Sequence, residues 1–166
     1  MGSALFTEGE VYLRDYQPED APALWRLFFD TVRRVNRREY SAAQVEAWAS
    51  EDIDPLDWQA LLDHNRPFIV EQSGRILGYA DLQPDGLIDH FFCHRQAQGK
   101  GVGTRLMVHI ELQAQYLGLN ALHAHVSLTA EPFFKRFGFE VVKREVVQVR
   151  GQTLSRCLMR RDLSSK

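Results

Sequence analysis

Apolar residues in the N-terminal part of the chain recur mainly with a helical period. Residues 10–16 alternate as in a first strand, and residues 21–36 repeat their apolar positions as an amphipathic helix does. Ser41 is a good N-cap for a second helix that ends at Ala49, and a third helix is predicted over residues 55–63. We therefore expect one strand and three helices in this part.

The middle of the chain has the pattern of consecutive short strands. Residues 67–72 and 75–83 are apolar runs separated by Ser73-Gly74, which is typical of a β-hairpin. Turn residues at 84–86 follow, and residues 87–93 have the pattern of one further strand. Together these segments predict an antiparallel meander.

The C-terminal part combines a long helix with further strands. The helical period returns after Gly101, and Gly118 is a typical C-terminal stop. Five apolar positions are expected on the buried face of this helix: Val102, Leu106, Ile110, Ala114 and Leu117. A strand at 121–127, a short helix at 130–137 and a final pair of strands turning at 150–151 follow, so the element order predicts an α/β fold.

The composition is that of an ordinary globular domain. The 166 residues are 45% hydrophobic and 25% charged, with a net charge of −2. We expect a single domain over residues 1–166 and no nucleic-acid partner, because no basic surplus is present. Two cysteines favour a reducing, cytoplasmic location. The N-terminus lacks the pattern of a signal peptide, and no apolar run reaches the ~18 residues of a membrane span, so we expect no membrane partner.

A glycine-rich loop precedes the long helix and carries the clearest chemistry. Gly99, Gly101 and Gly103 fall within residues 98–104, where unpaired amide groups and the helix dipole favour an anion such as a pyrophosphate. Neither the Rossmann nor the Walker spacing is present, because Thr104 stands where the former needs glycine. A glycine-rich tight turn with no ligand is the alternative reading.

The loop and a second segment resemble one family. Gln98-x-x-Gly101-x-Gly103 is similar to the pyrophosphate signature of the GNAT superfamily of acyl-CoA-dependent N-acetyltransferases, and residues 130–139 are similar to its A-x-x-F-Y-x-x-x-G-F segment. The resemblance implies a central mixed, mostly antiparallel sheet flanked by helices, with a splay between the fourth and fifth strands. It further implies transfer of an acetyl group from acetyl-CoA to a primary amine, by direct attack in a ternary complex, with CoA as product.

The resemblance also implies positions for the cofactor. It assigns the pyrophosphate to the backbone amides of seven loop residues: Gln98, Gly99, Lys100, Gly101, Val102, Gly103 and Thr104. Main-chain groups of Phe91 and Cys93 would pair with the pantetheine amides, and Ser127 would touch the pantetheine arm. Phe134 would pack against the sulfur end of the cofactor.

Phe134 departs from the family pattern, which has a tyrosine that protonates the departing thiolate. Phenylalanine has no exchangeable proton, so another group or water must act instead, and Tyr40 and Tyr79 are possible substitutes. The alternative function is a catalytically weak CoA-binding sensor or regulatory module.

Two residues are candidates for the general base that takes a proton from the acceptor ammonium. Asp89 shares a strand face with Phe91 and Cys93 by the period of two, and His125 shares a face with Ser127. The alternative is that both are ordinary half-buried residues. The histidines of the two strands lack a carboxylate or cysteine that would complete a ligand set, so no metal is expected.

The acceptor is not defined by these patterns. A small-molecule or peptide amine is expected, bound near the N-terminal helices, which carry an acidic surplus and the aromatic residues Trp48 and Trp58. The chain is expected to be a monomer or a homodimer.

Overall fold

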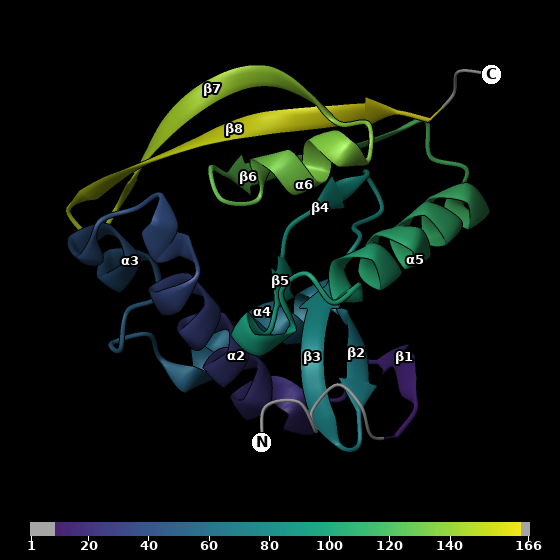
Figure 1. Cartoon of the computed structure of the whole chain (residues 1–166), viewed down its shortest axis with the longest axis horizontal. Coiled ribbons are helices and arrows are strands. Elements are labelled where there is room, and N and C mark those ends of the chain that lie inside the picture. Colours follow the sequence, from purple (N-terminus) through teal and green to yellow (C-terminus); the bar gives the residue numbers. More distant parts are fainter. Residues whose placement is uncertain (1–8, 164–166) are drawn as a thin grey trace.

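The computed structural model describes residues 9–163, and its strands form two sheets of four (Figure 1). The first sheet is antiparallel throughout, in the spatial order β1 (Val11–Asp15), β2 (Phe68–Gln72), β3 (Arg75–Ala80), β5 (Phe91–Cys93). The second has one parallel pair, β4 with β6, and has the order β4 (Leu87–Ile88), β6 (Ala121–Ser127), β8 (Gln152–Asp162), β7 (Glu140–Val149).

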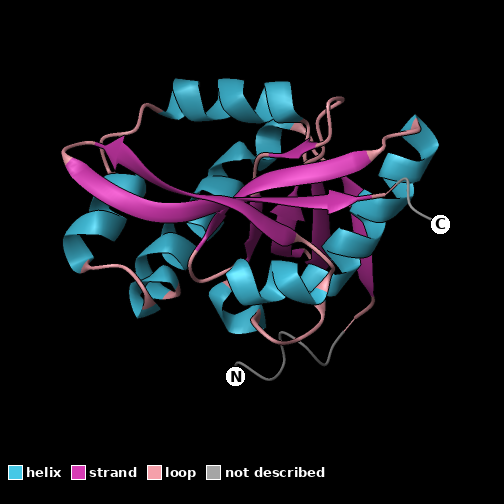
Figure 2. Cartoon of the chain, turned by 90° about the horizontal axis from the view of Figure 1, so that it is seen from above, coloured by secondary structure: helices cyan, strands magenta, loops and turns pink. Residues whose placement is uncertain are grey.

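Helices lie on either side of the strands (Figure 2). The α-helices are α2 (Ala21–Arg34), α3 (Ala42–Trp48), α4 (Pro55–Asn65), α5 (Val102–Leu117) and α6 (Glu131–Arg136), and the short 3-10 helices are η1 (Pro18–Asp20), η2 (Asn36–Arg38) and η3 (Arg95–Ala97). The expected capping is confirmed at Ser41, whose hydroxyl accepts the Gln44 N–H at 3.1 Å. Gly118 ends α5 in the left-handed conformation with φ 70°. The predicted mixed α/β architecture is confirmed.

The strand predicted over residues 87–93 is interrupted, and this is a correction to the sequence analysis. β4 pairs in parallel with β6, whereas β5 pairs with β3, and Asp89 and His90 between them belong to neither strand. The chain therefore passes from one sheet to the other at these two residues. The expected splay lies here, since β5 is the edge strand of its sheet and is not paired with β6.

The buried carboxylate of Asp81 holds the interruption in place. Its Oδ1 accepts the Asp89 N–H and its Oδ2 accepts the His90 N–H, both at 2.9 Å. A side-chain amide of Gln83 donates to Oδ1 at 3.1 Å. Asp81 is 0% exposed, so the carboxylate supplies acceptors that a strand partner would otherwise provide to these amides. Burial raises the pKa of Asp81 to about 6.

Apolar packing divides into two clusters that meet along the first sheet. One lies under α5 and includes Leu106, Met107 and Ile110, each fully buried. The other lies among α2, α3 and α4 and extends to Tyr79 on β3. Leu117 was expected on the buried face of α5, but it is 50% exposed because the helix ends one residue later at its glycine cap. Truncating a fully buried leucine in such a core costs about 2–5 kcal/mol.

The long β7–β8 hairpin reaches the N-terminal helices. Arg150 and Gly151 form its two-residue turn with φ 43° and 83°, as a type I′ hairpin turn requires. Figure 1 shows this turn beside α3, and the Gln44 side chain donates to the Thr153 carbonyl at 2.8 Å. The helices and the C-terminal hairpin are thereby joined across the molecule.

No helix within residues 9–163 is long and apolar enough to cross a membrane. Residues 1–8, on which the expectation of no signal peptide partly rests, lie outside the described part of the chain.

The Asp81 carboxyl predicts a specific pH dependence of stability. A carboxyl whose pKa is raised in the folded chain binds its proton more tightly there, so its contribution to stability grows as the pH falls through about 6. The free energy of unfolding of the wild type relative to Asp81→Asn should increase by about 1 kcal/mol between about pH 7 and pH 5. Urea unfolding of both proteins measures this difference.

A difference that stays constant with pH would contradict the assignment. Carbon-13 NMR titration of the Asp81 carboxyl in the wild type gives the pKa without relying on the variant.

Candidate active site

A first cavity, of about 600 Å³, lies between the glycine-rich loop, β5 and the start of α6. Gly99 and Gly101 have φ 74° and 87°, and a Cβ atom on either would meet nothing within 4 Å. Their conformation, rather than crowding, therefore requires glycine. Gly101 caps α5, so the first N–H groups of that helix point out of its N-terminus beside the cavity. This arrangement is suited to an anion.

Gly103 has a different role from the other two glycines. A Cβ atom there would come within 3.0 Å of the Phe133 ring and 3.7 Å of the Cys93 sulfur. Its absence lets the first turn of α5 approach α6 and β5 closely. Of the seven loop residues expected at the cofactor, the cavity is lined by Gln98, Gly99, Gly101, Gly103 and Thr104. Lys100 and Val102 are not among its lining residues.

The main chain of β5 presents two residues to the splay. The His94 N–H donates to Leu77 and the Asp81 N–H donates to His90, at 2.7 and 3.2 Å. Since antiparallel pairs alternate, the main-chain groups of Phe91 and Cys93 face away from β3. They point toward the opening, as expected for residues that bind an extended ligand.

The Cys93 carbonyl is already occupied within the chain. It accepts the Thr31 hydroxyl at 2.9 Å and the Gln98 side chain at 2.8 Å. A carbonyl oxygen has two lone pairs, so the N–H of Cys93 is the group left for a ligand. Burial raises the pKa of the Cys93 thiol to about 12, which disfavours the nucleophilic thiolate form.

Ser127 and Phe134 lie on the opposite side of this cavity. The Ser127 hydroxyl oxygen accepts the Ala130 N–H at 3.1 Å and the Asn36 side-chain amide at 3.5 Å, which leaves its own proton to donate. Phe134 is 3% exposed and packs edge-on against Phe91. Its ring forms an apolar floor of the cavity and has no exchangeable proton to donate.

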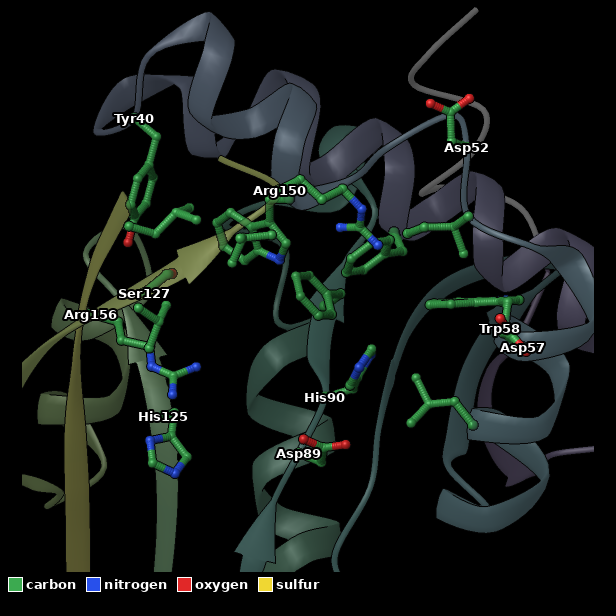
Figure 3. Close-up of a pocket in the computed structure, with 18 of the residues that line it drawn as sticks. Tyr40, Asp52, Asp57, Trp58, Asp89, His90, His125, Ser127, Arg150 and Arg156 are labelled. Carbon is green, nitrogen blue, oxygen red and sulfur yellow. The ribbon is translucent and has the colours of Figure 1, made fainter. Parts of the chain in front are cut away.

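The second cavity, of about 620 Å³, lies between the N-terminal helices and the β7–β8 hairpin (Figure 3). Aromatic side chains form much of its wall, and three exposed carboxylates lie at its rim. The aromatic residues are Phe28, Tyr40, Trp48, Trp58 and Phe92, and the carboxylates are Asp52, Asp54 and Asp57. Phe92 and Ser127 line both cavities. A molecule in one cavity can therefore meet a molecule in the other at these two residues.

Both candidate bases lie in the second cavity, on different elements (Figure 3). Asp89 is exposed at the strand interruption and accepts the Asn65 side-chain amide at 2.9 Å. His125 on β6 has its Nδ1 2.6 Å from a carboxylate oxygen of Glu145, which also accepts Arg156 at 3.1 Å. The hydrogen bond from His125 holds the pKa of Glu145 below its usual value. The fold thus brings together two residues that the sequence separates by a helix.

Neither candidate proton donor lines the first cavity. Tyr40 lines the second cavity, but its hydroxyl donates to the Ser155 carbonyl at 2.5 Å and accepts the Leu128 N–H at 2.9 Å. Tyr79 is 0% exposed, lines neither cavity, and lies with its hydroxyl 3.0 Å from Nδ1 of His90. Burial raises the pKa of both phenols.

His90 is a cavity residue that the sequence patterns missed. Strict alternation places it on the face opposite Asp89, yet the interruption lets both residues line the second cavity. Only its position next to Asp89 could have pointed to it. Arg136, which lines the first cavity together with Arg38, was also not identified from the sequence. Within residues 9–163 no three His, Cys, Asp or Glu side chains are grouped as a metal site.

Comparisons with known proteins point to one family. The acetyltransferase (GNAT) domain description matches residues 36–158. The uncharacterized N-acetyltransferase YafP of Escherichia coli (strain K12) is 29% identical over 150 residues, which are 90% of this chain and 95% of YafP.

Solved structures agree with this. A GCN5-related N-acetyltransferase structure from Rhodopseudomonas palustris, described as "Aminotransferase, Class-II", is 31% identical, with a TM-score of 0.87 over 95% of this chain and 99% of that one. The paia N-acetyltransferase of Thermoplasma acidophilum, solved in complex with coenzyme A, has a TM-score of 0.71 at 15% identity, over 93% and 99% of the two chains. At that identity the likeness concerns the fold.

The two hydrogen bonds of Tyr40 predict a loss of stability when its hydroxyl is removed. Tyr40→Phe leaves the Leu128 N–H and the Ser155 carbonyl without this partner, so the free energy of unfolding should fall by about 1 kcal/mol. Denaturant unfolding measures the change. Tyr116→Phe is the matched control, because Tyr116 is 85% exposed and its change should be close to zero. Equal effects of the two substitutions would contradict the bridging role of Tyr40.

Proposed function

Because the chain belongs to the GNAT acetyltransferase family, we propose that it transfers the acetyl group of acetyl-CoA to a primary amine by direct attack within a ternary complex. The observation that carries the proposal is the meeting of the two cavities at Phe92 and Ser127. One cavity has the anion-binding loop, and the other has titratable side chains and aromatic walls. A thioester in the first and an amine in the second can approach without a covalent enzyme intermediate.

The cofactor is proposed to follow the loop and β5. The loop residues that line the cavity would hold the pyrophosphate through their amides, where the helix dipole of α5 adds positive potential: Gln98, Gly99, Gly101, Gly103 and Thr104. Arg38 and Arg136 at the same cavity add side-chain charge for its phosphates. The pantetheine arm pairs with Phe91 and with the N–H of Cys93, and its thioester end reaches the Phe134 floor. The coenzyme A complex of the Thermoplasma acidophilum protein supports this choice of cofactor.

The proton of the acceptor ammonium is proposed to pass to His125. A carboxylate can only accept, so the bond to Glu145 requires a proton on Nδ1 of His125. In neutral His125 the unprotonated nitrogen is then Nε2, which is free to act as a base. The Asp89 carboxylate lies across the cavity from His125. Its negative charge holds the acceptor ammonium before the proton is transferred to His125. The acidic rim favours a cationic amine as it approaches.

The departing thiolate is proposed to be protonated by solvent. A thiolate is a good leaving group, and both phenols considered for this step point elsewhere. Ser127 retains a hydroxyl proton at the meeting point and can donate a hydrogen bond to the developing negative charge on sulfur. Phe134 also favours the alternative, a CoA-binding module with little turnover. Release of CoA across a panel of primary amines distinguishes the two functions.

The loop assignment predicts a large loss of cofactor affinity in Gly101→Val. Valine at φ 87° is strained by about 1–3 kcal/mol, so the loop is expected to change conformation and acetyl-CoA affinity to fall at least about tenfold. Isothermal titration calorimetry measures the affinity.

Gly118→Val is the matched control for this experiment. Gly118 has φ 70° and open space around it, at the other end of the same helix. The Gly118→Val protein should lose about as much stability as Gly101→Val while keeping its acetyl-CoA affinity. Unchanged affinity in Gly101→Val would show that the loop does not bind the cofactor.

The different roles proposed for His125 and Asp89 predict different kinetic effects of their substitution. His125→Gln should lower kcat/KM about 10²-fold or more and remove the acidic limb of its pH profile, because the base is lost. Asp89→Asn should mainly raise KM and keep that limb, because it loses a binding charge. The opposite pattern would make Asp89 the base.

A further inference from the structure

His90 lies among aromatic rings at the wall of the second cavity, which we call the acceptor cavity because it is proposed to bind the amine. Its ring stacks on Phe28 at 5.7 Å between centroids and lies edge-on to Phe92 at 5.6 Å and tilted to Trp58 at 5.9 Å. Figure 3 shows the imidazole directed into the cavity. This surrounding lowers the pKa of His90, so the ring is neutral near neutral pH and carries one proton.

The buried phenol of Tyr79 determines which ring nitrogen carries that proton. The Tyr79 hydroxyl lies 3.0 Å from Nδ1 of His90, and this is its hydrogen-bond partner within residues 9–163. A donor Nδ1–H would leave the phenol proton unpaired in a fully buried position, which is costly. The phenol therefore donates to Nδ1, and the proton of the neutral imidazole is on Nε2.

We propose that Tyr79 fixes His90 as the Nε2–H tautomer, so that His90 presents a hydrogen-bond donor to the acceptor cavity and selects amines that carry an oxygen acceptor close to the reacting nitrogen. The proposal rests on the acetyltransferase function proposed above. Tyr79 is a positioning residue, and His90 is a specificity-determining one.

The partner of the donor must be an oxygen of the acceptor substrate. The reacting nitrogen needs its lone pair for attack on the thioester, so it cannot also accept a hydrogen bond from His90 at that moment. His90 lines the second cavity and not the first, so the acceptor is the molecule proposed to supply the partner. A hydroxyl, carbonyl or carboxylate oxygen on the amine substrate fits this position.

The titratable groups around His90 do not offer an alternative role as a base. Asp89 is its neighbour in the chain, Tyr79 faces it from β3, and Asp81, one residue after β3, accepts its N–H. Phe28 on α2 and Trp58 on α4 complete the surroundings without charge. The Nδ1 lone pair is occupied by Tyr79, so proton transfer from the ammonium is left to other residues.

The tautomer can be tested without any turnover. Long-range ¹H–¹⁵N NMR correlation of the wild type near pH 7.5 (about one unit above the ordinary histidine pKa) should show protonated Nε2 and unprotonated Nδ1 in His90. A protonated Nδ1 would overturn the proposal. Because this measurement needs neither acetyl-CoA nor an acceptor, its outcome is independent of whether the proposed function holds.

Selectivity is tested with pairs of primary amines that differ in one hydroxyl or carbonyl oxygen near the nitrogen. The wild type should prefer the oxygen-bearing member about tenfold in kcat/KM, as expected for one hydrogen bond. His90→Phe should abolish the preference, while His90→Gln, which keeps an N–H donor, should restore part of it with an unchanged acidic limb of the pH profile.

His123→Phe is the matched control, because His123 lines neither cavity and its loss should leave the preference intact. A preference that survives in His90→Phe would overturn the proposal, and so would loss of the acidic limb in His90→Gln. If no amine is acetylated, titrating the same amine pairs against the His90 Nε2–H resonance shows whether the oxygen is bound.

Discussion

The carboxylate of Asp81 binds two consecutive backbone N–H groups, and the arrangement of both cavities depends on it. An uninterrupted strand over residues 87–93 would keep β5 beside β6 and close the space between the sheets. Instead the amides of Asp89 and His90 turn to Asp81, and the chain leaves the second sheet after Ile88. Burying a carboxylate costs free energy, shown by its raised pKa, and the donors around it offset that cost.

The same interruption changes which side chains face the second cavity. In a regular strand, neighbouring residues point to opposite faces. At the break, Asp89 and His90 both line one cavity, while β5 resumes with the main chain of Phe91 and Cys93 facing the other. One local departure from alternation therefore provides the second cavity with polar groups and the first cavity with an unpaired strand edge.

The features that the sequence predicted are those encoded locally. Ser41 caps its helix through the residue three positions later, Gly118 ends α5 by its own backbone freedom, and the turn at Arg150 needs only two residues. The loop at 98–104 is of this kind too. The interruption at Asp89 was not predictable, because its cause, Asp81, lies in another segment just after β3 and looks like an ordinary polar residue in the sequence. The contact between Tyr79 and His90 was not predictable either, because it depends on the pairing of β3 with β5.

Two histidines in one cavity have opposite chemistry because their partners differ. Glu145 can only accept a hydrogen bond, so His125 carries its proton on the nitrogen that faces that carboxylate and has a lone pair on the other. Tyr79 has a proton that its buried position requires it to donate, so His90 has the reverse arrangement. The residue type is the same for both, so it does not distinguish a proposed base from a proposed donor. The distinction comes from the residue behind each ring, which is why the sequence could place His125 in the site but could not assign a role to His90.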